Sequence, residues 1–182
     1  MKNINLIFIL YFCILLSSES LPQESLSIGG YIGGGVISGN TAERGSFSSS
    51  IFFEADPGIY QDLSLRLSFL YHTDFNSVLP NTTKKYYPFL RGLGLKAITF
   101  QRIGHNLFIE EGLGIITLND RTLSGIDEWD YGVNFSLAAG FDLRNIENKG
   151  FKISLGAEYG LTFFKTLPTY FSTYLQVQYF FF

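Results

Sequence analysis

Residues 151–163 read FKISLGAEYGLTF, and this stretch decides the fold. Apolar and aromatic side chains occupy every second position, whereas small or charged side chains such as Lys152 and Glu158 fill the positions between them. Successive side chains of a β-strand point to opposite faces, so a period of two predicts a strand with one apolar face. A helix would need a period near 3.6 residues, and the stretch has none.

The same alternation runs through other parts of the chain. It is clear in residues 63–72, 133–144 and 170–181, and less regular in residues 26–37, 47–55, 89–99 and 107–118. The pattern therefore predicts eight strands. In residues 107–118, Glu110 and Glu111 are adjacent, so one of them faces outward, sits at a bulge or lies at the membrane boundary.

The composition resembles that of a membrane protein. Aromatic residues make up 17% of the chain, charged residues make up 16%, and the mean hydropathy is +0.17. Beyond the N-terminal region no segment has the roughly twenty apolar residues of a transmembrane helix. Because backbone amides in hydrocarbon must all be paired, these features predict an all-β, eight-stranded antiparallel up-and-down transmembrane β-barrel. A net charge of −3 offers no broad basic surface for nucleic acid.

The N-terminus has the three parts of a secretory signal. Lys2 precedes an apolar run over residues 4–16, and small residues follow at 17–20. The run is too short for a bilayer-spanning helix. We therefore expect a cleaved signal peptide over residues 1–20 and one barrel domain over residues 21–182. Cys13, the only cysteine, lies within the peptide, so the barrel would contain no disulfide.

The connections between the predicted strands differ in length. GNTAERG (39–45), HTDFNSVLPNTTKKYYP (72–88) and NDRTLSGIDEWDY (119–131) are long, whereas ADPGIYQD (55–62), FQRIGHN (100–106) and NIENKG (145–150) are short. Outer-membrane barrels combine long external loops with short periplasmic turns. This asymmetry places both termini on the periplasmic side, although the last external connection, near FKTLPT (164–169), is short.

The last strand ends in aromatic residues in a particular pattern. Leu175, Val177, Tyr179 and Phe181 alternate along one face, and Phe182 follows as an extra residue. Over about residues 21–182 the chain resembles the small eight-stranded OmpA/OmpX-like outer-membrane proteins, whose C-terminal β-signal has this form. The resemblance implies a bacterial outer-membrane location, contact with lipid and lipopolysaccharide, and recognition by the barrel-assembly machinery. The extra residue leaves a second register open, in which Phe180 and Phe182 face outward.

An eight-stranded barrel is just wide enough for its own side chains to fill the interior. Polar side chains on the inward face should therefore pair with one another, since buried charges need partners. We expect an internal network that plugs the lumen, with Arg66, Lys96 and Glu158 at its centre. The full set of predicted interior polar residues is Glu54, Arg66, Lys96, Asp142, Arg144, Lys152, Glu158, Gln176 and Gln178.

Other polar and aromatic residues suggest sites at the strand ends. Tyr86, Tyr87, Trp129 and Tyr131 fit an aromatic girdle at the headgroup level. His72 is a weak catalytic candidate, because some barrels of this shape hydrolyse or transfer lipid A acyl groups with a His. Its preferred interpretation is a polar residue at the membrane boundary.

Metal and phosphate motifs are weak. Asp120, Asp127, Glu128 and Asp130 could approach a calcium ion but lack EF-hand spacing, so a solvated external loop is the preferred interpretation. YIGGGVISG (31–39) lacks the Lys-Ser/Thr and the helix of a phosphate loop. We expect no cofactor and no metal.

The function that these features favour is non-enzymatic. It is a structural or surface-interaction role in which external loops near residues 73–88 and 118–131 contact a host or envelope ligand. The alternatives are a narrow porin or apolar-solute conduit, a lipid A acyl hydrolase or transferase, and a secreted lipocalin-like barrel. The last alternative requires the apolar faces of the strands to point inward.

Overall fold

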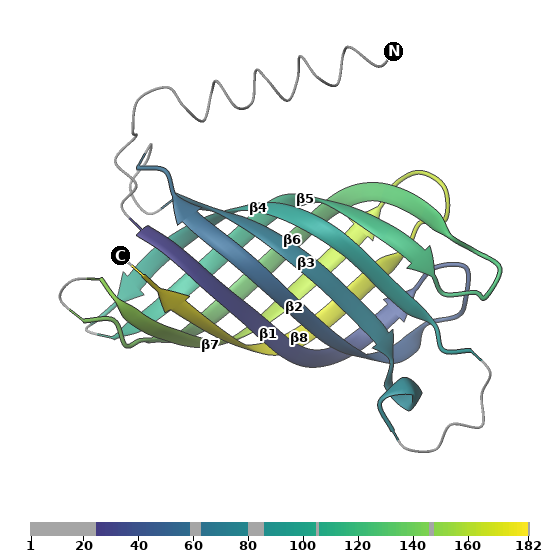
Figure 1. The fold of residues 1–182 in the computed structure, drawn as a ribbon, viewed down its shortest axis with the longest axis horizontal. Coiled ribbons are helices and arrows are strands. Elements are labelled where there is room, and N and C mark those ends of the chain that lie inside the picture. The colour runs from purple at the N-terminus through teal and green to yellow at the C-terminus, as the bar shows by residue number, and fades with distance from the viewer. Residues whose placement is uncertain (1–24, 59–62, 80–85, 105, 146–147, 182) are drawn as a thin grey trace, which may run out of the picture.

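The computed structural model describes residues 25–58, 63–79, 86–104, 106–145 and 148–181, and the predicted signal peptide lies outside this part of the chain. The described residues form a closed β-barrel (Figure 1). Its strands are β1 (Ser25–Ser38), β2 (Arg44–Asp56), β3 (Leu63–Asp74), β4 (Phe89–Ile103), β5 (Leu107–Arg121), β6 (Glu128–Asp142), β7 (Gly150–Thr162) and β8 (Thr169–Phe180). The predicted all-β, eight-stranded antiparallel barrel is confirmed.

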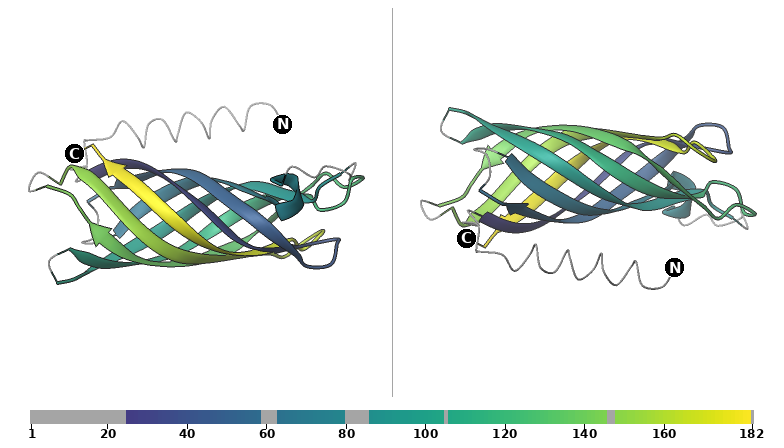
Figure 2. Two further views of the ribbon diagram at one scale, coloured as in Figure 1. Left: turned by 90° about the horizontal axis from the view of Figure 1, so that it is seen from below. Right: turned by 90° about the horizontal axis from the view of Figure 1, so that it is seen from above.

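Each strand pairs with its neighbours in sequence, and β8 pairs with β1 to close the barrel. All pairings are antiparallel, so the topology is up-and-down. The start of β1 and the end of β8 lie at the same end of the barrel (Figure 2). No helix in the described part of the chain is long and apolar enough to span a membrane.

The two ends of the barrel carry different connections. At the end away from the termini the strands are joined by residues 39–43, 75–88, 122–127 and 163–168, with a short 3-10 helix at Phe75–Ser77. The predicted long loop over residues 119–131 is wrong in extent, because the β5–β6 ladder continues as far as the pair Asp120 and Glu128. Backbone pairing therefore continues into a polar sequence that resembles a loop. The predicted length asymmetry holds only for the connection over residues 75–88, because residues 39–43, 122–127 and 163–168 form connections no longer than residues 143–149 at the other end.

The apolar faces of the strands point away from the barrel axis. On β7, Phe151 is 49% exposed on the outer surface, while Lys152 is only 5% exposed inside. The same alternation holds on β3, where Leu67 is exposed and Arg66 and Ser68 are buried. The secreted lipocalin-like alternative required the opposite orientation, so it is wrong.

Glycine and tyrosine residues shape the seam where β1 meets β8. A Cβ at Gly33 would lie 2.0 Å from the carbonyl oxygen of Thr173, and one at Gly35 would lie 1.8 Å from that of Phe171. Next to them, the rings of Tyr31 and Tyr174 stack with centroids 4.3 Å apart. Glycine is therefore needed here for close approach of the closing strands, not for phosphate binding.

Candidate functional site

The barrel interior is crossed by charged side chains. The Arg66 guanidinium on β3 donates from Nε to Glu54 on β2 at 2.6 Å, and its Nη2 contacts Glu110 on β5. Its Nη1 also donates to the Oε1 of Gln176 on β8 at 3.2 Å. Arg66 thus links β3 to three other strands. The side chains of Arg66, Glu54, Glu110 and Gln176 are all buried.

A second ion pair joins more distant strands. Lys96 on β4 donates from Nζ to Glu158 on β7 at 2.5 Å. The other carboxylate oxygen of Glu158 accepts from Asn134 Nδ2 at 3.0 Å and from the hydroxyl of Tyr170. These contacts satisfy a carboxylate that is only 1% exposed, as a buried charge requires.

The two neighbouring glutamates on β5 have different environments. β5 pairs with β4 in an unbroken register from Phe89 and Arg121 to Ile103 and Leu107, so no bulge is present between these strands. Glu110 points inward to Arg66, and Glu111 is exposed on the outer surface. The sequence left this choice open because strand parity becomes decisive only when the register is known.

The end of the barrel near the termini is lined by cations and aromatic rings. Lys152 Nζ lies 3.7 Å from the ring centroid of Phe100 and 4.7 Å from that of Phe180. Arg144 donates to Asp142 from Nε at 2.9 Å and from Nη2 at 2.7 Å. At this end of the lumen the cations of Lys152 and Arg144 are therefore stabilised by aromatic rings and by the carboxylate of Asp142.

The last strand has a single register. Phe180 is 2% exposed inside the barrel, so the alternative in which it faces outward is wrong. Leu175, Val177, Tyr179 and Phe181 lie on the outer surface, and Phe182 lies outside the described residues. On the inner face, Gln178 Nε2 donates to Ser27 Oγ on β1 at 2.7 Å.

His72 faces the barrel interior near the end of β3. It is fully buried, and its ring centroid is 4.2 Å from that of Tyr170. Neither ring nitrogen has a hydrogen-bond partner in the described part of the chain. The Asp74 carboxylate instead accepts hydrogen bonds from Asn76. His72 and Asp74 therefore do not form the hydrogen-bonded pair that an acyl-transfer site would use.

Two acidic residues at the end of the barrel away from the termini are structural and not solvated. The Asp130 carboxylate is buried and accepts backbone N–H bonds of 2.9–3.1 Å from Phe164, Lys165, Thr166 and Leu167. This convergence of N–H groups explains the left-handed backbone of Leu167, whose φ is 52°. The prediction of a solvated loop was therefore wrong for Asp130, because its partners lie far along the chain.

Asp120 has a similar role at the end of β5. Its Oδ1 accepts from the backbone N–H and the hydroxyl of Thr122 at 2.8 and 2.7 Å, and its Oδ2 accepts from Asn40 at 3.1 Å. Glu128 remains exposed and accepts from Lys165, and this hydrogen bond raises the pKa of Lys165. No group of three or more His, Cys, Asp or Glu side chains that could hold a metal ion is present among the described residues.

The predicted girdle residues occupy two environments. Trp129 and Tyr131 are 43% and 62% exposed on the outer surface of β6. Tyr86 instead donates its hydroxyl to the carbonyl oxygen of Arg121 at 2.5 Å and so joins the connection over residues 75–88 to the end of β5. Burial raises the pKa of the Tyr86 hydroxyl. Tyr87 is half-buried, so these two tyrosines pack on the protein itself.

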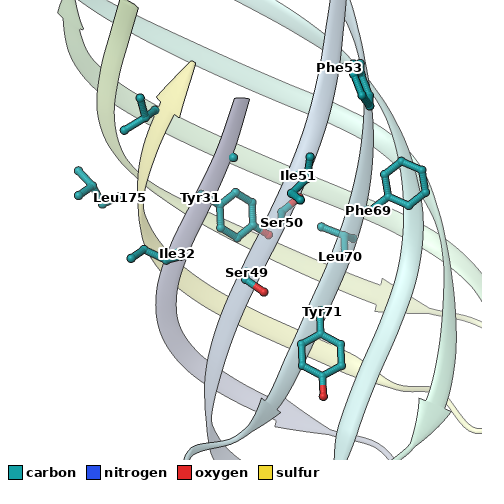
Figure 3. A pocket seen from close by; sticks show the side chains of 12 residues that line it. Tyr31, Ile32, Ser49, Ser50, Ile51, Phe53, Phe69, Leu70, Tyr71 and Leu175 are labelled. Atoms are coloured by element: carbon teal, nitrogen blue, oxygen red, sulfur yellow. The ribbon is translucent and has the colours of Figure 1, made fainter. Parts of the chain in front are cut away.

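The outer surface also contains an apolar hollow of about 750 Å³ (Figure 3). It is lined by residues of β1, β2, β3 and β8, among them Ile32, Ile51, Phe69 and Leu175. None of the ion-paired side chains of the interior lines this hollow, although the buried residues Tyr31, Ser50 and Leu70 do.

Comparison with solved structures shows the same architecture. Neisserial surface protein A is matched with a TM-score of 0.62 at 11% identity, over 85% of this chain and 96% of that one. The chain has the fold of the small outer-membrane barrels. The Yersinia pestis Ail protein, solved with the heparin analogue sucrose octasulfate, gives a TM-score of 0.51 at 14% identity, over 86% and 97% of the two chains.

A third match is the N-terminal β-barrel domain of Pseudomonas aeruginosa OprF. Its TM-score is 0.50 at 14% identity, over 87% of this chain and 98% of that domain. No protein-family model matches the chain, and no curated protein matches its sequence. At such low identities the comparisons establish the fold and leave the function to be argued from the residues.

Proposed function

We propose that the chain is a non-enzymatic outer-membrane barrel whose interior is closed and whose external loops bind a ligand at the cell surface. The observation that carries this proposal is the pair of ion-pair clusters that cross the lumen, centred on Arg66 and Glu158. A barrel with an apolar outer surface is stable in lipid, because exposing that surface to water would cost a free energy of about 25 cal/mol per Å².

The reach of the charged side chains supports the proposal of a closed interior. Arg66 contacts β2, β5 and β8, and Lys96 on β4 contacts β7, so the contacts extend across the barrel in several directions. The charges are also balanced, since Glu54, Glu110 and Glu158 face Arg66, Lys96 and Lys152 inside. A hydrated ion would have to break these pairs to pass, which disfavours the porin alternative.

Planar-bilayer recording tests the closed interior. The wild-type barrel should give no steady single-channel current, whereas the double variant Lys96→Ala, Glu158→Ala should give small openings because both halves of one crossing are removed. A matched control is the pair Lys165→Ala, Glu128→Ala, which removes an exposed ion pair outside the lumen. Large, steady wild-type currents would show that the barrel is a pore.

The external connections supply the proposed binding surface. They expose apolar side chains away from the outer belt, including Val78, Leu79, Phe164 and Leu167 at 54–69% exposure. Exposed apolar patches of this kind are typical of binding sites. The barrel of similar fold from Yersinia pestis was solved with a heparin analogue, which supports the search for a surface ligand of envelope or host origin.

Loop substitution tests the surface role. Val78 and Leu79 can be replaced by serine. The control is Leu155→Ser, which also replaces an exposed apolar side chain by serine but lies on the outer face of β7 and not in a loop. Binding to immobilised lipopolysaccharide, and to whole host cells, should fall for the loop variant while its heat-dependent mobility on a gel stays unchanged. Undiminished binding to both surfaces would contradict the proposed role of this loop.

A further inference from the structure

Within the described strands, one carboxylate points outward among apolar side chains. Glu111 points outward on β5 between Ile109 and Leu113. The apolar side chains continue beyond it in both directions, since Leu107 toward the near end and Ile115 toward the far end are 47% and 64% exposed. Along β5, Glu111 is therefore flanked on both sides by apolar outward side chains.

This position is unfavourable for a barrel surrounded only by lipid. A charged side chain on the lipid face of a barrel is destabilising, and more so near the middle of the bilayer. Glu111 forms no hydrogen bond or ion pair within the described residues, in contrast to Glu110 beside it. A carboxyl group in hydrocarbon needs a hydrogen-bonding partner, and a donor on a neighbouring protein molecule can supply it.

The neighbouring strand supplies the complementary groups. In the β4–β5 register, Glu111 lies opposite Thr99, and Ile109 lies opposite Gln101, and both β4 residues are exposed on the same outer face. The face therefore combines an acceptor on one strand with hydroxyl and amide donors on the adjacent strand. If a two-fold rotation about an axis between β4 and β5 generates a second copy, each acceptor of one copy lies against a donor of the other.

The next register pair is complementary in size. Leu113, at 56% exposure, lies opposite Ala97, which is also exposed. The same two-fold rotation exchanges these positions, so a large side chain on one copy meets a small one on the other. Small residues at membrane interfaces allow backbones to approach closely, which favours packing of protein against protein.

We propose that a second copy of this chain packs on the β4–β5 face, with Glu111 hydrogen-bonded to Thr99 of the second copy and reciprocally. An isologous interface of this kind needs only one self-complementary patch. The proposal rests on the outer-membrane placement, because only in lipid does Glu111 lack water as a partner.

The test uses the full-length barrel, purified from membranes and inserted into phosphatidylcholine vesicles. Dimerisation is measured by energy transfer between donor-labelled and acceptor-labelled copies as the ratio of protein to lipid is varied. We compare wild type with Glu111→Leu and Thr99→Val. The control is Thr173→Val, which removes an outward threonine from β8 on the far side of the barrel.

We expect the wild type to dimerise and Glu111→Leu to raise the dissociation constant at least about ten-fold, because two symmetric hydrogen bonds are lost. Thr99→Val should weaken the dimer in the same direction, and Thr173→Val should leave it unchanged. If the barrel inserts and its mobility on a gel depends on heating, but it stays monomeric, this inference is wrong and the proposed function is unaffected. A barrel that does not insert overturns both.

Discussion

Arg66 is the residue whose loss should reveal most about the interior. It lies between Glu54 and Glu110, and its side chain is 2% exposed. Arg66→Met keeps an unbranched apolar stem and removes the guanidinium and its charge, leaving two buried carboxylates without their cation. Breaking a buried ion pair by removing one partner costs about 3–5 kcal/mol. The contact of the guanidinium with the Phe52 ring, 4.2 Å from its centroid, is lost as well.

The comparison that isolates the charge effect is a triple variant. Replacing Arg66, Glu54 and Glu110 together by Met removes all three charges, and such replacements are often neutral or stabilising. We therefore expect the triple variant to recover most of the stability that the single variant loses. Polar contacts with Gln176 are lost in both, so they do not affect the comparison.

The assay is urea unfolding in lipid vesicles. The folded fraction is read from the heat-dependent gel shift and from the fluorescence of Trp129, the only tryptophan. A loss below about 1 kcal/mol for Arg66→Met would refute the argument, since it would mean that water or another cation compensates the carboxylates. A triple variant as unstable as the single one would show that packing, and not charge, is responsible.

Other substitutions test separate parts of the structure. Gly35→Ala places a Cβ against a carbonyl oxygen of β8 and should lower the free energy of unfolding by about 1–3 kcal/mol in the same urea assay. Asp130→Ala removes the acceptor of the last external connection, so limited proteolysis there should accelerate roughly ten-fold, while an unchanged rate would contradict the anchoring role. His72→Ala and wild type should both lack lipid A acyl-hydrolase turnover, because neither ring nitrogen of His72 has a hydrogen-bond partner among the described residues. Turnover by the wild type that the variant loses would show that His72 is catalytic. Phe181→Ala should reduce recovery in the outer-membrane fraction more than Phe171→Ala, an outward control at the other end of β8.

The strands were predictable because their signal is local. The alternation in residues 151–163 places Phe151 and Lys152 on opposite faces whatever the rest of the chain does. It also predicted that Arg66, Lys96 and Glu158 would share one side of the sheet. The loop boundaries were harder, since polar sequences such as residues 119–121 and 128–131 pair as strands only because a neighbouring ladder extends to them.

Tertiary structure decided which charges meet. Arg66 and Glu110 are far apart in sequence and two strands apart in the barrel, and only closure with a fixed register brings them together. The same register sends Glu110 inward and Glu111 outward, a choice that two adjacent identical residues cannot encode locally. Sequence by itself determined the strands and their two faces, because side-chain direction follows from backbone geometry. The ion pairs, the buried His72 and the anchor at Asp130 required the closed barrel, because each depends on contacts between distant strands.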